Sequence, residues 1–227
     1  MPQKKTDQLE FAWPKPVYVL SVGEIYDTLD PDRIKELGED SRFERKPAGI
    51  HPSALAEYLS MFANTKPDGG IVAVGIEDGG ALSGCRSLSR SEINNLERCG
   101  DTHCVDSRYE VKKLPVKDVT GDDNFVLIFR VYYREDKVVV TNSGKAFHRR
   151  GESKTKLTPE AIRELQLDKG EVDLELEPCK TLRYPEDFDL DLVDQYASEF
   201  IKSRELKNVT SREEILVLRH LGITKGE

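Results

Sequence analysis

Three carboxylates in the first half of the chain are of the type and placement that could hold a divalent cation. Glu39 and Glu44 lie five residues apart, and Asp78 follows the apolar run 71–76. Mg²⁺ and Mn²⁺ prefer oxygen ligands, and a cation bound there would polarise a phosphodiester, activate water or a ribose 2′-hydroxyl and neutralise the leaving oxygen. A structural alternative is that Glu44 pairs with Lys46, because residues two apart on a strand share a face. Glu39 would then be an ordinary surface acid.

Basic residues later in the chain form the second candidate site. Between residues 130 and 163 there are nine basic and four acidic residues, a net charge of +5, whereas residues 168–199 carry three basic and eleven acidic residues, a net charge of −8. Aromatic residues interleave with the basic ones and could stack on unpaired bases while Arg and Lys meet phosphates. Alternatively, the aromatic residues belong to a strand core and the charges form a solvated surface. The candidate nucleic-acid ligands are Lys46, Arg130, Arg134, Lys145, Arg149, Arg150, Lys154 and Lys156.

Within that set, Arg149, Arg150, Lys154 and Lys156 are the preferred candidates. The segment Gly-Glu-Ser-Lys-Thr at 151–155 precedes an expected helix, and a loop before a helix can present donors to an anion.

One short stretch combines residue types that bind zinc. Cys99, His103 and Cys104 are close in sequence, and Cys85 is the nearest further thiol. A structural zinc site needs four ligands, and this spacing does not match a Cys-x-x-Cys knuckle. We therefore expect a loop with two thiols and no zinc.

The elements that position these residues follow from periodicity and capping signals. Apolar residues at helical spacing predict a helix that starts near His51, and the continuous apolar run 71–76 predicts a central strand buried on both faces. Ser21 with Glu24 has the spacing of a capping box. The other predicted elements are strands at 17–20 and 42–46, helices at 89–98, 158–167, 190–203 and 211–221, and two hairpins, one pairing 109–116 with 124–133 and the other pairing 137–141 with 146–150.

Bulk properties describe a polar globular protein. The chain has 227 residues, with 37% hydrophobic and 33% charged residues and a net charge of −8. No apolar run has the length of a membrane span, and no apolar signal region follows the first residues, so we expect a cytoplasmic protein with no membrane partner. The four cysteines are scattered along the chain, so we expect reduced thiols. We expect a flexible tail at 1–16, an α/β domain at 17–167, an acidic linker at 168–189 and a helical extension at 190–227 that is truncated before a further domain.

A series of short motifs connects the two candidate sites. Its members are Gly38-Glu39, Phe43-Glu44 with Lys46, Phe62 to Thr65, Gly69-Gly70, Gly75 to Asp78, and Arg149-Arg150-Gly151 with Ser153. In this order the motifs resemble the Schlafen AlbA-type domain over residues 20–167. The chain departs from the family's pattern at two places. Arg45 stands where an aromatic residue is usual, which suggests a twisted or edge strand. Residues 66–68 lengthen the turn between the expected helix and the next strand.

The resemblance implies both a fold and a function. It implies an α/β domain with a mixed sheet that binds nucleic acid, DNA or RNA, followed here by a C-terminal helical extension. Glu39, Glu44 and Asp78 would form a metal-dependent endoribonuclease centre with Mg²⁺ or Mn²⁺. The alternative is a non-catalytic DNA-binding module of a transcriptional regulator, with ATP handled by a missing C-terminal ATPase-like domain. The apolar stripes of the last two helices further suggest a homodimer.

Overall fold

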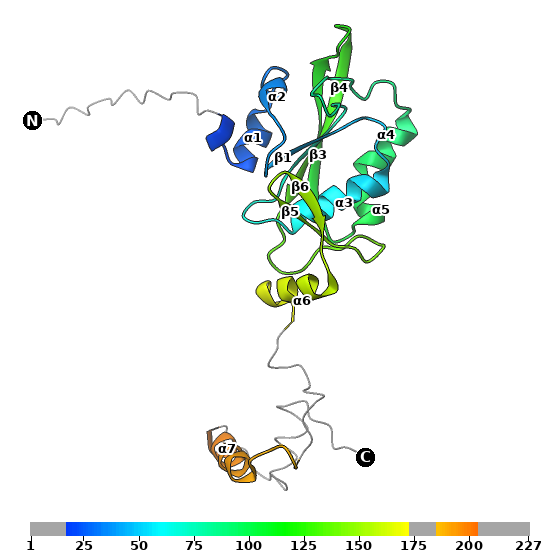
Figure 1. Ribbon diagram of the computed structural model, residues 1–227. Helices are drawn as coiled ribbons and strands as arrows, with labels where there is room; N and C mark the ends of the chain where they lie inside the picture. Colours follow the sequence, from blue (N-terminus) through cyan, green and yellow to red (C-terminus); the bar gives the residue numbers. More distant parts are fainter. Residues whose placement is uncertain (1–16, 173–184, 204–227) are drawn as a thin grey trace, which may run out of the picture. The chain divides into compact units, whose positions relative to one another are not determined.

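The computed structural model describes residues 17–172 and 185–203 and divides into two compact units, residues 1–165 and 166–227. The first unit contains a four-stranded sheet in the order β1-β2-β4-β3 (Figure 1). Its strands are β1 (Phe43–Lys46), β2 (Gly70–Val74), β3 (Arg108–Lys117) and β4 (Asp123–Tyr132). β1 runs parallel to β2, and the other neighbours are antiparallel. The predicted α/β class with a mixed sheet is confirmed, and β1 lies at an edge as Arg45 suggested.

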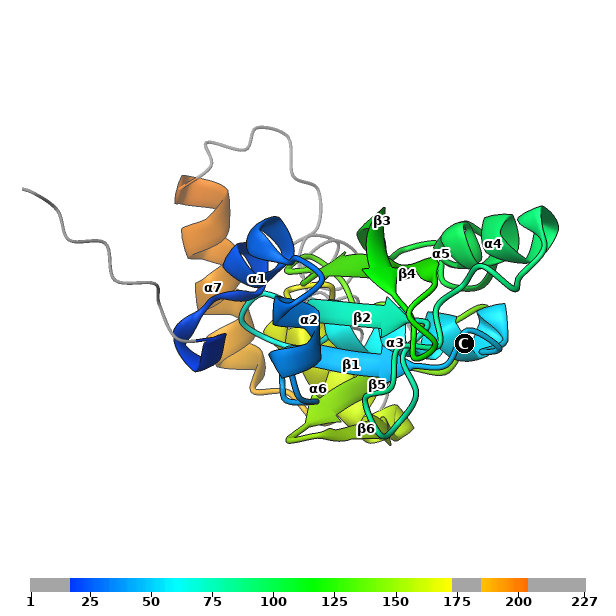
Figure 2. The same ribbon diagram turned by 90° about the horizontal axis from the view of Figure 1, so that it is seen from above.

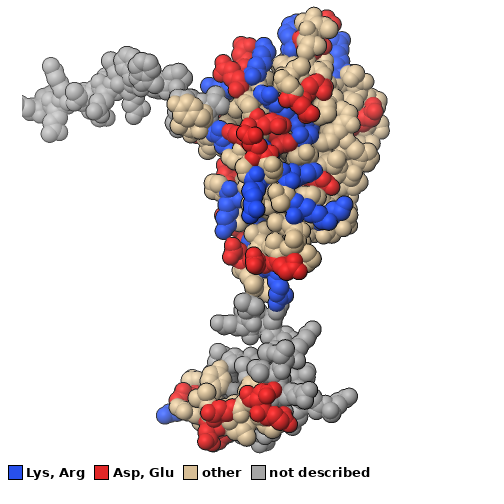
Figure 3. Space-filling model, viewed as in Figure 1, with Lys and Arg blue, Asp and Glu red and all other residues tan. Residues whose placement is uncertain are grey.

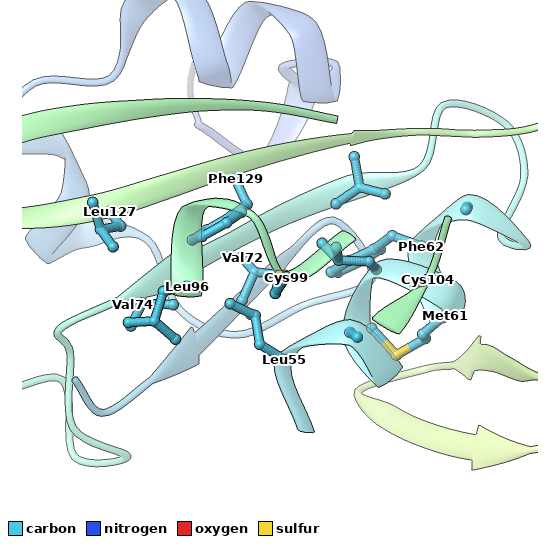
Figure 4. Packing of buried hydrophobic residues seen from close by; sticks show 14 of the residues in the cluster. Leu55, Met61, Phe62, Val72, Val74, Leu96, Cys99, Cys104, Leu127 and Phe129 are labelled. Atoms are coloured by element: carbon cyan, nitrogen blue, oxygen red, sulfur yellow. The ribbon is translucent and has the colours of Figure 1, made fainter. Parts of the chain in front are cut away.

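The two central strands are buried on both faces, and this produces two hydrophobic cores. Side chains of a strand alternate between faces, so Val72 and Val74 of β2 join one core while Ile71 and Ala73 join the other. α3, α4 and α5 supply the first core, which contains Phe62 and the residues labelled in Figure 4. α1 and α2 supply the second, on the opposite face of the sheet (Figure 2).

Capping signals in the sequence locate the helix starts well. Ser21 and Glu24 form the expected capping box of α1, and Ser89 with Glu92 forms another at α4. His51 caps α3 through its ring nitrogen, which accepts from the backbone N–H of Ser53. The helices are α1 (Val22–Thr28), α2 (Arg33–Glu36), α3 (Pro52–Ala63), α4 (Arg90–Glu97), α5 (Cys99–His103), α6 (Pro159–Asp168) and, in the second unit, α7 (Leu190–Ser203).

The second predicted hairpin is wrong in its pairing. β5 (Phe147–Arg150) pairs antiparallel with β6 (Ser153–Lys156), and residues 137–141 contribute only the bridge between Val140 and Ala146. The segment that we expected to be a loop before α6 is therefore half of a hairpin. Its turn at Gly151 has φ +61°, a conformation that glycine adopts without strain.

Two shorter predictions also need correction. The expected strand at 17–20 is a 3₁₀ helix, η1 (Val17–Val19), in which Tyr18 and Val19 are exposed. The Cys-rich stretch expected to be a loop is the short helix α5. The tail 1–16, most of the linker and the helix expected at 211–221 lie outside the described residues. Of the helices in the described ranges, none is long and apolar enough to span a membrane.

Candidate nucleic-acid interface

Glu44 is a buried carboxylate whose charge is balanced by two cations. It lies on β1 and is 5% exposed. The Arg149 guanidinium donates to its Oε2, and the Lys46 ammonium lies 2.6 Å from its Oε1. Burial by itself would lower the pKa of Lys46, but the hydrogen bond and the charge of Glu44 outweigh burial and raise it. A buried carboxylate without such partners would be costly, so this cluster binds β1 to β5.

The other two expected metal ligands do not join Glu44 in a cluster. Glu39 accepts a hydrogen bond from the Arg45 backbone N–H at 2.9 Å and lies 3.8 Å from the Lys46 ammonium. Asp78 is exposed in the turn after β2. Within residues 17–172 and 185–203, no group of three or more His, Cys, Asp or Glu side chains is placed to hold a metal ion. The expected convergence of the three carboxylates is therefore not present, and the pairing of Glu44 with Lys46 is the arrangement observed.

Arg149 is a structural side chain and does not face solvent. Besides Glu44, its guanidinium donates to the carbonyl oxygens of Asp40 and, at 3.1 Å, of Gly151. Its planar group lies over the Phe62 ring at 5.5 Å. The residue is 3% exposed. Our assignment of Arg149 to a phosphate contact conflicts with this burial, because these partners already use its donors.

The end of α3 fixes the position of β5. Asn64 donates from its amide to the carbonyl oxygens of Val139 at 2.8 Å and Phe147 at 3.2 Å, and its Oδ1 accepts from the Val139 N–H at 2.9 Å. The Thr65 hydroxyl accepts from the Arg149 N–H at 3.0 Å. Buried polar groups need such partners. The Phe-Ala-Asn-Thr motif thus anchors β5, a role that the sequence alone did not reveal although the motif itself was evident.

Two further arginines of the basic stretch are held inside the domain. Arg130, 3% exposed, lies 2.7 Å from the Asp68 carboxylate, and Arg134 lies 2.7 Å from that of Asp136. The Arg134 hydrogen bond holds the pKa of Asp136 below its usual range. Arg134 also donates to the Asp106 carbonyl oxygen at 2.7 Å. The prediction that these two arginines belong to an exposed basic surface is therefore wrong.

Lys154 of β6 is half-buried on the side of the hairpin that meets α3. Its ammonium donates to Glu57 and lies 4.2 Å from the Tyr58 ring centroid and 5.1 Å from that of Phe147. Lys46 lies 4.9 Å from the same Tyr58 ring. Cation–π contacts of this kind contribute about 0.5–2 kcal/mol each. These contacts hold β6 against α3.

The remaining predicted cations are exposed. Lys145, Arg150 and Lys156, here called the hairpin cations, form no ion pair within the described part of the chain. Arg150 follows the buried Arg149 in β5, so the two side chains point to opposite faces of the strand. In Figure 3, Lys and Arg side chains gather over the region where β5, β6 and α3 lie in Figure 1. Lys156 pairs with Phe147 across the hairpin and therefore lies on the face opposite Arg150. The structure thus reduces the predicted basic segment to three exposed cations on and next to the hairpin.

The thiols near α5 are buried. Burial raises the pKa of Cys99 and of Cys104 to about 12 and that of Cys85 to about 11. Cys85 donates to the Val74 carbonyl oxygen at 3.2 Å and Cys104 to the Val140 carbonyl oxygen at 3.6 Å. At neutral pH these side chains are protonated thiols that pack in the core.

Comparison with known proteins identifies the family of this domain. No curated protein matches the chain. A solved structure, the DIP2311 protein from Corynebacterium diphtheriae, is similar with a TM-score of 0.43 and 20% identity, covering 82% of this chain and 35% of that chain, so this chain spans about a third of that protein's length. The model of the family described as Schlafen, AlbA_2 matches residues 39–158, which include every strand from β1 to β6. Because that match covers more than half of the 227 residues, the chain belongs to the Schlafen AlbA_2 family.

Proposed function

We propose that this domain binds nucleic acid through the hairpin cations. The observation that carries the proposal is that Lys145, Arg150 and Lys156 are exposed and lack ion pairs within the described residues, in a chain whose net charge is −8. In an acidic chain, exposed cations without acidic partners on and next to one hairpin favour an anionic ligand. Membership in the Schlafen AlbA_2 family supports the same class of ligand.

The contrast with the buried arginines makes these three residues the better candidates for phosphate ligands. Arg130 and Arg149 would have to leave carboxylates and a low-dielectric environment before they could meet a phosphate, which is costly. Arg150 and Lys156 are already solvated, so binding releases counterions from the nucleic acid without breaking a protein contact. The affinity should therefore fall steeply as salt concentration rises.

The salt dependence of binding tests this assignment. Changing both Arg150 and Lys156 to Ala should weaken binding and make the slope of log K against log salt less negative by about 1.5, because each phosphate contact contributes about 0.7–0.9 to the slope. The control double variant changes Lys35 of α2 and Lys117 of β3 to Ala. Both side chains are exposed, and this variant removes the same charge from elements outside the hairpin. Equal slopes for the two double variants would refute the proposal.

The type of nucleic acid and the cleavage of RNA are separate questions. The endoribonuclease activity and the DNA-binding regulator that the resemblance implies both stay predictions. In this structure Arg149 and Lys46 occupy the Glu44 carboxylate, so an Mg²⁺ or Mn²⁺ ion shared by Glu39, Glu44 and Asp78 would require these side chains to rearrange. Gels of tRNA, single-stranded DNA and duplex DNA with Mn²⁺ or EDTA would distinguish cleavage from binding. Cleavage that needs Mn²⁺ and is lost in Glu44→Gln would support the nuclease.

A further inference from the structure

We propose that a polar cleft beside the hairpin holds a guanine base of a bound single-stranded nucleic acid, an inference that rests on the proposed function. The cleft has a volume of about 330 Å³ and lies among the first two turns of α3, the end of α5 and the turn at residues 141–145. Specific recognition of single strands generally uses unstacked bases that hydrogen-bond in such recesses. The volume is at the lower end of the range typical for small ligand sites.

The cleft is continuous with the proposed phosphate-binding surface. Lys145, one of the hairpin cations, lines it and lies two residues before β5. Glu57 lines it from α3 and accepts the hydrogen bond of Lys154 from β6. Lys156 lies two residues after Lys154 on β6 and shares its face, so a strand whose phosphate meets Lys156 can place a base in the cleft.

The pairing of a carboxylate with a cation favours guanine, because uracil and thymine offer the carboxylate one N–H donor where guanine offers two. Guanine presents two adjacent N–H donors and a carbonyl oxygen on its Watson–Crick edge. The Glu57 carboxylate can accept from both donors, since each oxygen has two lone pairs and Lys154 uses only part of that capacity. The Lys145 ammonium can donate to the carbonyl oxygen. Adenine and cytosine place a ring nitrogen lone pair beside their amino group, and that lone pair would face the carboxylate.

The cleft is held in shape by hydrogen bonds in the unliganded protein. The Asn142 side-chain amide donates to the Thr102 carbonyl oxygen at 2.6 Å, and the Asn142 backbone N–H donates to the His103 carbonyl oxygen at 2.8 Å. The Thr141 and Ser143 hydroxyls lie 3.0 Å apart within the same turn. These contacts tie the turn to α5, so little conformational entropy is lost when a base enters. His103 also lines the cleft, and its planar ring offers a stacking surface.

Binding of octanucleotides tests the inference. We would measure by fluorescence anisotropy the dissociation constants of oligouridine octamers that carry one central G, A or C or no substitution, and of the deoxythymidine counterparts. The G-bearing octamer should bind about tenfold or more tightly than the others, as expected for one bidentate base contact. Comparing the dissociation constants of the uridine octamers with those of the deoxythymidine octamers shows whether the base comes from RNA or from DNA.

Glu57→Gln should abolish this preference, because the amide presents one donor where the carboxylate had only acceptors. The control is Glu152→Gln, which removes the same charge from the exposed turn of the hairpin and should leave the preference intact. If Glu57→Gln unfolds, as thermal melting would show, Glu57→Asp serves instead, since it keeps the charge but withdraws the carboxylate and should still reduce the preference.

The outcomes separate the two proposals. Equal binding of all octamers with a steep salt slope would overturn the guanine site and leave the hairpin surface standing. A preference that survives in Glu57→Gln would also overturn it. A preference that Glu57→Gln removes, together with normal binding by the Arg150 and Lys156 double variant, would support the cleft and refute the hairpin surface. If no octamer binds, the guanine site is wrong, and the salt dependence measured with tRNA and duplex DNA then decides whether the hairpin surface stands.

Discussion

Replacing Arg149 by Met should destabilise the domain strongly, whereas the same replacement of its neighbour Arg150 should not. Arg149→Met leaves the Glu44 carboxylate buried with Lys46 as its remaining cation and deprives the Asp40 carbonyl oxygen of a donor. Removing one partner of a buried ion pair typically costs about 3–5 kcal/mol. Because Lys46 still lies 2.6 Å from the carboxylate, we expect a value of about 3 kcal/mol.

Urea denaturation followed by circular dichroism measures this loss. With a denaturant slope of about 2 kcal/mol per molar urea, a loss of 3 kcal/mol lowers the unfolding midpoint by about 1.5 M. Arg150→Met changes an exposed side chain and should shift the free energy of unfolding by less than about 0.5 kcal/mol. Under conditions in which both variants are folded, Arg150→Met should weaken nucleic-acid binding more than Arg149→Met does.

A double-mutant cycle identifies the cause. Glu44→Gln combined with Arg149→Met should be less destabilising than the sum of the two single changes, because the second change removes the charge that the first left unpaired. Midpoints for Arg149→Met and Arg150→Met that agree within error would refute the structural role of Arg149. Strict additivity in the cycle would show that Glu44 and Arg149 are not coupled.

Two further predictions concern acid stability and self-association. The Arg134 hydrogen bond lowers the pKa of Asp136 in the folded state. The stabilisation that ionised Asp136 contributes is therefore present above its unfolded pKa near 4 and is lost as pH falls through its folded pKa. Asp136→Asn should flatten the fall of melting temperature below pH 4, whereas Glu135→Gln should not. α7 exposes Leu192 (64%) and Tyr196 (46%), so if the expected homodimer uses this helix, changing both to Ser should convert a dimer into a monomer in sedimentation equilibrium.

Local signals were sufficient to predict most elements from the sequence. The Ser-x-x-Glu sequences at Ser21 and Ser89 start helices where expected, and the apolar run after Gly69-Gly70 is the fully buried strand β2. These features depend on residues within one turn or one strand, so the sequence pattern contains the information needed. The β3–β4 hairpin belongs to the same class, because both of its strands flank one turn at Gly121.

The partner of β5 could not be predicted from such signals. Residues 137–141 and 146–150 flank the turn at 142–144 and have the pattern of a hairpin. In the fold, the backbone of Val139 bonds instead to Asn64, 75 residues earlier in the chain. β5 then pairs with β6. A contact between residues so far apart decides which local pairing forms, and nothing in the pattern of either segment reports it.

The same limit applies to the basic residues. Composition identified the charges of Arg130 to Lys156 but not their partners. The Glu44–Arg149 contact joins residues 105 apart, and the Arg130–Asp68 contact joins residues 62 apart. Whether a cation meets a carboxylate or solvent depends on such distant contacts, so residue type and spacing predicted the region of the candidate surface without separating its structural members from its exposed ones.

The register of β5 connects the family motif to the proposed function. Successive strand side chains point to opposite faces, so a shift of one residue would expose Arg149 and bury Arg150. The contacts that prevent this shift come from Asn64 and Thr65, which bond to the backbone of Phe147 and Arg149. Residues at the end of α3 therefore determine which arginine is buried beside Glu44 and which is exposed to solvent, where the proposed function would place a phosphate.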